Sequence, residues 1–364
     1  MTGTSEPWQP TQHGPTAQAQ AQAQAQATQD GQTASAITLL TLGGTIFMAQ
    51  DSEGGHAVPD AAAGERLRGT HMDGVDLTSR EIANVSSSDV RPRHLREVLE
   101  HARRAVDEGA DGVVLTHGTD TLEETAFVLN RYWDREAPLV VTGAMRPASA
   151  PGADGPANLR DAVATAAAPS ARGWGVLVVF DGHVHLADQA TKASSRSVSA
   201  FASSPSGPFA KVGEGDLHLL HRPFDRVARV AQAESVPPNR FPAVPILTAG
   251  LDEDFTLLDH VPARSIAGLV IAGVGMGHVS PAAMPRLRRL LDAGTPVVVA
   301  TRIASGGTST YHYAYPGSEV DLLDAGALMA GFVPPAQARL LLQVLLADDA
   351  GPDQIRESFE AYAS

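Results

Sequence analysis

The chain has 364 residues, a formal net charge of −14 and no cysteine, and 43% of its residues are hydrophobic. This length and composition predict about two globular domains with large apolar cores, and no run of about 18 apolar residues is present that would span a membrane. The absence of cysteine excludes disulfides, thiolate catalysis and cysteine-ligated zinc, and the acidic balance argues against a nucleic-acid partner, because phosphates need clustered Lys and Arg.

Residues 1–35 differ in composition from the rest of the chain. Residues 17–27 alternate Ala and Gln, and the only charged residues of the segment are Glu6 and Asp30. Such a segment cannot bury enough apolar surface to offset the entropy of ordering it, so we expect a disordered tail. It lacks the basic start and apolar core of a secretory signal and the Arg enrichment of a transit peptide, which favours a cytoplasmic location.

From Ala36 onward, strand-like and helix-like runs alternate. Short apolar runs predict buried strands, and in the first half of the chain they cover residues 37–42, 81–85, 112–116, 139–142 and 175–181. Apolar residues three or four apart predict helices over residues 92–108, from Asp120 or Thr121 to about 134, and after Asp154 and Pro156. Asp89 or a nearby serine is the expected cap of the first helix.

The remaining segments of the first half are predicted from turn-forming residues. Residues 43–69 are rich in Gly, Ala and Asp and predict a mobile loop, of which residues 47–66 would order over a bound substrate. Residues 183–188 alternate as in a hairpin, and the Ser- and Pro-rich residues 194–208 predict little regular structure.

The second half restarts the same alternation after a proline-rich stretch. Predicted strands cover residues 244–248, 268–272 and 296–301, and predicted helices cover 254–260, 281–293 and, as the terminal helix, 336–347. The fold class is therefore two parallel-sheet α/β domains with right-handed crossovers. We expect a tail at 1–35, a larger flavodoxin- or Rossmann-like catalytic domain at 36–220, a linker at 221–242 and a smaller α/β domain at 243–364.

Polar residues follow two of the predicted strands where each strand ends. Gly43, Gly44 and Thr45 follow the first strand, and the run HGTDT at residues 117–121 follows the strand at 112–116. Ligands bind at the carboxyl ends of the strands in an open α/β sheet, so the two hydroxyls can converge on one small substrate. Taken alone, the first motif is equally a tight turn and the second an ordinary helix start with an acidic first turn.

Activation of such a hydroxyl needs a base, a lysine or an oriented partner. Lys192 is one of only two lysines in the chain, and beside Thr119 it would act as a base or hold a proton network. Its alternative role is that of a solvated surface lysine. Asp120 can bind a substrate ammonium, and the start of the following helix would stabilise an oxyanion or a carboxylate.

At these residues the sequence resembles the bacterial-type L-asparaginase family. The similar segments are residues 41–46 (TLGGTI), 111–125 (DGVVLTHGTDTLEET), 142–147 (TGAMRP), 153–159 (ADGPANL) and 273–278 (GVGMGH), the last resembling the start of a C-terminal-domain helix. The resemblance runs from about Ile37 to the C-terminus and leaves only the tail outside.

The resemblance implies hydrolysis of L-asparagine to L-aspartate and ammonia through an acyl-enzyme, without metal or organic cofactor. Thr45 would be the nucleophile, and Thr119, Asp120 and Lys192 would form a second catalytic cluster, with Asp120 also binding the α-amino group. The implied substrate contacts include those of Ser87, Ser88, Gly118 and His278. The family forms homodimers or homotetramers whose subunits complete each other's sites, so self-association is implied as well.

This chain departs from the family pattern at four places. Residues 47–69 contain no tyrosine where the family's first loop carries one, and Ser88 stands where glutamine is frequent. His278 stands near the position of the neighbouring subunit's asparagine, and the family's acidic residue of the C-terminal domain falls within residues 308–315, which hold no Glu or Asp. A hydroxyl from Tyr311, Tyr313 or Tyr315 is a substitute that the sequence does not place.

Several other functions stay open at this stage. Glutamine hydrolysis and the amidase part of an archaeal-type glutamyl-tRNA amidotransferase are alternatives, although the amidotransferase subunit carries an additional amino-terminal domain. A non-catalytic amino-acid-binding protein on the same scaffold is a third. The glycines at 273–277 are spaced poorly for dinucleotide binding, and His183 and His185 resemble a zinc pair but are expected to be exposed hairpin residues.

Overall fold

The computed structural model describes residues 34–50, 57–59, 72, 74–221, 235–262 and 265–361. The predicted tail therefore lies outside the described residues except for its last two positions. So do most of residues 47–66, which were predicted to close over a substrate, and much of the predicted linker.

The N-terminal domain is built on an eight-stranded sheet with the order β12-β11-β8-β7-β6-β5-β1-β4. The parallel strands are β1 (Ser35–Thr41), β4 (Val75–Glu81), β5 (Gly112–Thr116), β6 (Leu139–Thr142) and β7 (Val176–Phe180). Antiparallel strands continue the sheet beyond β7, namely β8 (His183–Leu186), β11 (Ala210–Gly213) and β12 (Asp216–Leu219). Since β1 lies between β4 and β5, the strand order reverses at β1, which is the usual position of a ligand site in such sheets.

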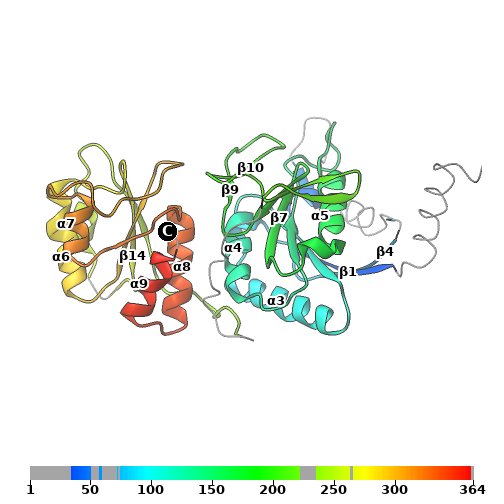
Figure 1. The fold of residues 1–364 in the computed structure, drawn as a ribbon, viewed down its shortest axis with the longest axis horizontal. Coiled ribbons are helices and arrows are strands. Elements are labelled where there is room, and N and C mark those ends of the chain that lie inside the picture. Colours follow the sequence, from blue (N-terminus) through cyan, green and yellow to red (C-terminus); the bar gives the residue numbers. More distant parts are fainter. Residues whose placement is uncertain are drawn as a thin grey trace, which may run out of the picture.

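Both faces of this sheet are covered by helices (Figure 1). Helices α3 (Pro92–Asp107) and α4 (Leu122–Tyr132) lie on one face, and α5 (Gly155–Ala167) lies on the other. Within β5, Val113 and Leu115 pack on the side of α3 and α4, whereas Val114 packs on the side of α5. This double burial explains why the central strands are continuously apolar in the sequence.

The strand predicted over residues 81–85 is wrong, because the strand in this part of the chain is β4, which ends at Glu81. It pairs with β1 from Val75 opposite Ser35 to Glu81 opposite Thr41, and residues 82–86 are irregular. β4 is an edge strand with mostly exposed side chains, so it lacks the apolar run by which buried strands are recognised.

Short strands occur in two segments that were predicted to be irregular. After the 3₁₀ turn η1 (Thr45–Phe47), β2 (Met48–Gln50) pairs with β3 (Ala57–Pro59). Between residues 194 and 208, β10 (Phe201–Ser203) pairs with β9 (Ala190–Lys192). Three-residue strands are too short to display an alternating pattern in the sequence.

The start of α3 was predicted correctly, but its cap was not. The N-cap residue is Arg91, and not Asp89 or a serine. The backbone N–H of Arg91 donates to Nδ1 of His94 at 3.1 Å. Asp89 instead forms an ion pair with Arg91 at 3.5 Å.

The C-terminal domain contains a parallel sheet in the order β13-β14-β15-β16. Its strands are β13 (Ile246–Thr248), β14 (Leu269–Gly273), β15 (Val297–Thr301) and β16 (Leu328–Met329). Its helices are α6 (Met284–Asp292), α7 (Glu319–Asp324), α8 (Pro335–Ala347) and α9 (Pro352–Glu360). The helix predicted at 254–260 is a 3₁₀ helix, η4 (Thr256–His260), and α8 is not terminal because α9 follows it. The predicted fold class of two parallel-sheet α/β domains is confirmed.

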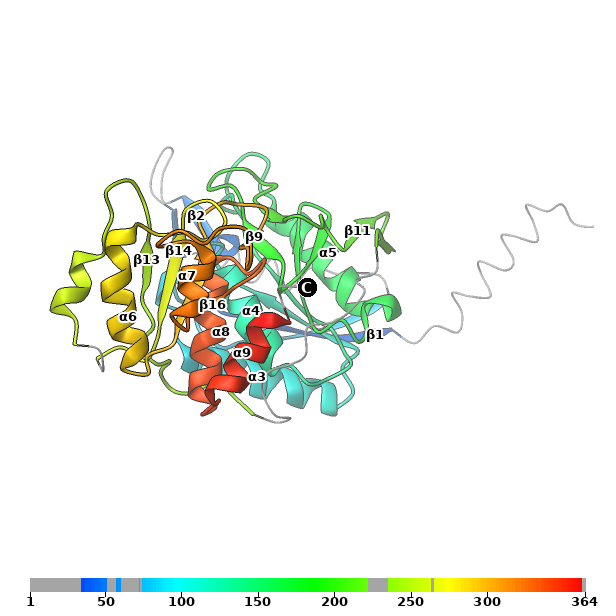
Figure 2. The same cartoon turned by 60° about the vertical axis from the view of Figure 1, so that its left-hand side comes forward.

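The two domains pack through α4 and α8, which lie side by side in both views (Figures 1 and 2). One apolar cluster runs from the N-terminal sheet through α4 and α8 to Val270 and Val298 of the C-terminal sheet. Arg339 of α8 also donates to Glu124 of α4 at 2.8 Å. Among the described helices, none has the length and apolarity needed to cross a membrane.

Candidate active site

The backbones of the two threonine motifs are in contact at the carboxyl ends of β1 and β5. Gly43 and Gly44 have φ angles of 96° and 101°. A Cβ added to Gly44 would lie 2.6 Å from the backbone N of Gly118, so only glycine allows this approach. Since Thr45 and Thr119 are the next residues along the two motifs, the fold brings them to neighbouring positions at the point where the strand order reverses.

Ser87 joins the same backbone contact from the segment that follows β4. A Cβ added to Gly118 would lie 2.9 Å from Cβ and 3.1 Å from Oγ of Ser87. Thr121 is the N-cap residue of α4, as expected, but its hydroxyl donates to the backbone carbonyl of Ser87 at 2.7 Å instead of to the helix, and so ties the two segments together. Ser87 is buried, whereas Ser88 is exposed and its hydroxyl contacts that of Ser86.

Thr119, Asp120 and Lys192 form one hydrogen-bonded cluster, as the sequence suggested. Nζ of Lys192 donates to Oγ1 of Thr119 at 2.9 Å and to Oδ1 of Asp120 at 2.7 Å. Thr119 is buried, the Lys192 side chain is 14% exposed and that of Asp120 is 76% exposed. The ammonium is therefore held inward against a hydroxyl, while one carboxylate oxygen faces outward and can accept from a ligand.

Lys192 reaches this position on β9, which is fixed from two sides. The backbone N–H of Lys192 donates to Oε2 of Glu123 in the first turn of α4. The buried Gln337 of α8 donates through Nε2 to the carbonyl of Ala190 at 3.1 Å, so the C-terminal domain holds the strand that carries the lysine. Burial raises the pKa of Glu123, and the hydrogen bond from the Lys192 backbone opposes this shift.

His117 belongs to the second motif but lies inside the fold. Its side chain is fully buried, and burial lowers its pKa to about 4. Nδ1 lies 2.6 Å from the Gly118 carbonyl and Nε2 lies 2.9 Å from Oγ1 of Thr125. Through these two contacts the neutral imidazole fixes the backbone of the motif relative to α4.

Thr45 is half-buried at the start of η1, and among the described residues its hydroxyl has no hydrogen-bond partner. The neighbouring Ile46 is buried against Ala144 and against Gly155, where an added Cβ would lie 2.8 Å from Ile46 Cγ1. Asp154 supports this surface, since Oδ2 and Oδ1 accept from the backbone N–H groups of Met145 and Arg146 at 2.9 Å.

His278 lies in a separate cluster in the C-terminal domain. It follows β14 in a tight turn, not at a helix start, with a bridge between Val274 and His278. Nδ1 of His278 lies 2.8 Å from the hydroxyl of Tyr315. Nε2 of His278 lies 2.8 Å from Oε2 of Glu319, which is ion-pair distance, but the angles between the two groups are not those of a hydrogen bond. None of the contacts described for His278 joins it to the Thr119–Asp120–Lys192 cluster.

Sequence reasoning missed Glu319. Its carboxylate is fully buried, and Oε1 accepts from the backbone N–H groups of His312 and Tyr313 at 2.6 and 2.7 Å. Burial alone would raise the pKa of Glu319, but these backbone donors and His278 hold it below its usual range. The acid lies four residues beyond the segment that the family pattern indicated, and α7 brings it back to His278.

The expectation that His183 and His185 are exposed is wrong, because His183 is half-buried and His185 is buried. Nδ1 of His185 lies 2.8 Å from Oγ of Ser203, and burial lowers the pKa of His185 to about 4. No group of three or more His, Asp or Glu side chains in the described part of the chain is arranged to hold a metal ion.

Comparisons with known proteins match both domains of the chain to one family. Residues 36–225 match the family model described as "Asparaginase, N-terminal", and residues 243–359 match the model described as "Glutaminase/Asparaginase C-terminal domain".

Individual relatives cover almost the whole chain. A probable L-asparaginase of Deinococcus radiodurans is 36% identical over 330 residues, which are 89% of this chain and 96% of the relative. A glutaminase-asparaginase of Pseudomonas fluorescens is 29% identical over 336 residues, which are 90% of each chain. The crystal structure of a probable cytoplasmic L-asparaginase from Campylobacter jejuni matches this chain with a TM-score of 0.75 and 29% identity. The matched region is 90% of this chain and 99% of that protein's chain.

Proposed function

Because the chain belongs to the asparaginase family, we propose that it is an amidohydrolase that converts L-asparagine and water into L-aspartate and ammonia. The observation that carries this proposal is the position of Nζ of Lys192, which donates to both Thr119 and Asp120 at 2.9 and 2.7 Å. A protein without a ligand site would gain little from burying a lysine ammonium near the carboxyl ends of β1 and β5.

In the first half-reaction, Oγ1 of Thr45 attacks the side-chain carboxamide carbon of asparagine. The threonine proton passes to the departing amide nitrogen, the C–N bond breaks, and ammonia leaves an acyl-threonine ester. Lys192 donates to the oxygen of Thr119, so the Thr119 hydrogen is free to point toward the reacting groups.

In the second half-reaction, water attacks the ester carbon and its proton returns to Thr45, which releases aspartate. The Thr119–Lys192 pair is proposed to orient this water. The outward carboxylate of Asp120 binds the α-amino group, and Ser87, Ser88 and Gly118 form the contacts to the α-carboxylate side.

His278 enters this proposal through self-association. We propose a homodimer or homotetramer in which His278, held by Glu319 and Tyr315, contacts the substrate of a neighbouring subunit. Exposed aromatic residues beside it support an interface, since Tyr311, Tyr313 and Tyr315 are 76%, 47% and 47% exposed. Light scattering after size-exclusion chromatography tests the assembly, and a monomer at working concentrations contradicts it.

The nucleophile is tested by ammonia release from L-asparagine, D-asparagine and L-glutamine, with wild type beside Thr45→Ala. Thr45→Ala should lose measurable turnover and keep its fold, because one loop hydroxyl contributes little to stability. Normal turnover by this variant contradicts the assignment of Thr45.

Glutamine hydrolysis is the second candidate, favoured by the relative named a glutaminase-asparaginase. The same assay separates the two, since a glutaminase releases ammonia faster from L-glutamine. A wild-type protein that binds L-asparagine but releases no ammonia from any amide would instead be an amino-acid-binding protein.

We also propose a cytoplasmic location, supported by the similarity to the probable cytoplasmic L-asparaginase from Campylobacter jejuni. Fractionation of native cells tests this proposal, and recovery of the protein outside the cytoplasmic fraction contradicts it.

A further inference from the structure

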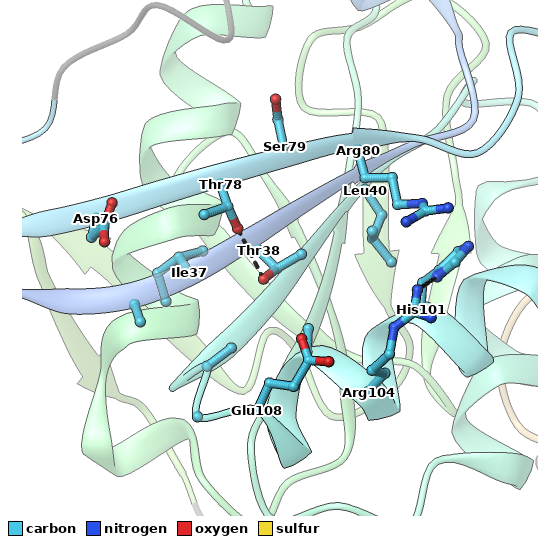
Figure 3. A pocket seen from close by; sticks show the side chains of 14 residues that line it. Ile37, Thr38, Leu40, Asp76, Thr78, Ser79, Arg80, His101, Arg104 and Glu108 are labelled. Atoms are coloured by element: carbon cyan, nitrogen blue, oxygen red, sulfur yellow. Dashed lines mark hydrogen bonds between the residues drawn. The ribbon is translucent and has the colours of Figure 1, made fainter.

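A cleft of about 500 Å³ lies beside the edge strand β4, between β4, β1 and the end of α3 (Figure 3). Helix α3 packs mainly against β1 and β5, so it leaves this face of β4 uncovered. Neither Thr45 nor any member of the Thr119–Asp120–Lys192 cluster lines the cleft. Its volume falls within the usual range of sites for small ligands.

Three basic side chains gather at one end of the cleft. Figure 3 shows Arg80 of β4 beside His101 and Arg104 of α3, with Asp76 at the other end. Within the described part of the chain, no carboxylate lies within ion-pair distance of Arg80 or Arg104. Two guanidinium groups therefore lie together at one end of the cleft, without a paired carboxylate among the described residues, on a chain whose net charge is −14.

The pKa of His101 responds to both guanidinium groups. Nδ1 of His101 contacts Nη2 of Arg104, which leaves Nε2 as the free ring nitrogen. Burial lowers the pKa of His101, and Arg80 and Arg104 lower it further, against the opposing charges of Glu97 and Glu100 on α3.

The floor of the cleft supplies hydroxyl groups. Oγ1 of Thr38 and Oγ1 of Thr78 lie 3.2 Å apart and share one hydrogen bond, so one of the two hydrogens remains free to donate to a ligand. Ile37 and Leu40 also line the cleft, but their side chains are 1% and 0% exposed, so they offer a ligand almost no apolar surface. Glu108 and Asp76 also line the cleft, so a second negative group on the ligand would be repelled from that side.

We propose that this cleft is a second ligand site, which binds a small organic anion through a phosphate or carboxylate group held by Arg80 and Arg104. Guanidinium groups bind both oxyanions through paired N–H donors, and the free threonine hydroxyl completes the set. This site goes beyond the proposed amidohydrolase activity and does not depend on it.

Titration calorimetry of the full chain with inorganic phosphate and, separately, with the monocarboxylate butyrate tests the proposal. At least one probe should bind saturably, and Arg80→Ala and Arg104→Ala should each weaken that binding at least about tenfold, as expected for a lost charge-assisted pair. Arg93→Ala is the matched control, because it removes the same charge from an exposed position of α3 outside the cleft, and it should change the dissociation constant less than about twofold.

Binding of phosphate alone assigns a phosphate-bearing ligand, and binding of butyrate alone assigns a carboxylate. If neither probe binds saturably, or if both arginine variants bind as wild type does, the proposal is wrong. Arg80→Gln provides a second variant should Arg80→Ala fold poorly. Asparagine hydrolysis by Arg80→Ala should equal that of wild type. A negative result for the cleft therefore leaves the assignment of Thr45 unchanged, and a negative result for Thr45 leaves the cleft proposal unchanged.

Discussion

At the scale of single residues, Lys192 is the group on which the candidate site most depends. It is one of two lysines, and its ammonium donates to the side chains of both Thr119 and Asp120. Lys192→Met keeps the side-chain length but removes the ammonium donors, so kcat should fall by about 10²–10⁴-fold.

Lys211→Met is the matched control, since Lys211 is exposed on β11, and its steady-state kinetics should match wild type. The double variant Thr119→Val with Lys192→Met should lose little more than either single variant, because members of one catalytic unit are not additive. Near-native kcat in Lys192→Met would remove the lysine from the mechanism.

The buried imidazole of His117 predicts a pH dependence of stability. Its pKa is about 4 in the fold, against about 6.5 in an unfolded chain. Between these values the unfolded state binds a proton that the folded state does not, so the free energy of unfolding falls as the pH falls from about 6.5 to 4, by roughly 3 kcal/mol.

Denaturant unfolding at several pH values measures this loss, and His117→Gln should show a smaller loss than wild type. His218→Gln, at an exposed position, serves as the comparison. Parallel curves for wild type and His117→Gln would contradict a buried neutral His117.

At the scale of elements, the contact between the ends of β1 and β5 sets the site. Gly44 has φ 101° and ψ 174°, a region that costs other residues about 1–3 kcal/mol, and its added Cβ would meet Gly118 at 2.6 Å. Gly109 has φ 108°, and no described atom lies within 4 Å of a Cβ added to it. Gly44→Ala and Gly109→Ala therefore share backbone strain, but only the first pushes the two motifs apart.

Both variants should lose about 1–3 kcal/mol of unfolding free energy. Gly44→Ala alone should also lower kcat, by about 10²-fold or more, because small misplacement of reacting groups is costly. Equal kcat in the two variants would show that the contact does not position Thr45.

At the scale of the whole molecule, the C-terminal domain supports strand β9, which carries Lys192. Gln337 is 2% exposed and donates to Ala190, two residues before Lys192. Gln337→Leu should cost about 1–3 kcal/mol by leaving a buried carbonyl without its partner, and it should lower kcat as β9 loosens.

Arg339→Ala separates this effect from general loss of domain contacts. Its ion pair with Glu124 is about one-third exposed on each side, so its removal should cost at most about 1 kcal/mol and leave kcat unchanged. A Gln337→Leu variant with wild-type kcat would show that β9 holds its position without α8.

The sequence by itself determined the alternation of buried strands and helices and the place of Thr45 and Thr119 at strand ends. These are local properties, because an apolar run, a glycine pair and a hydroxyl are read from neighbouring residues. It also indicated Lys192, as one of only two lysines in the chain and through the family resemblance. The edge strand β4 was misplaced, since an exposed strand carries no apolar run.

Only the tertiary structure decided which distant residues meet. Lys192 lies 73 positions from Thr119, Glu319 reaches His278 across 41 positions (319 − 278), and Arg80 faces Arg104 from a different element. Strand order and helix packing create these contacts, and no spacing along the chain encodes them. The charge that gathers beside β4 is therefore visible only once the sheet has an edge.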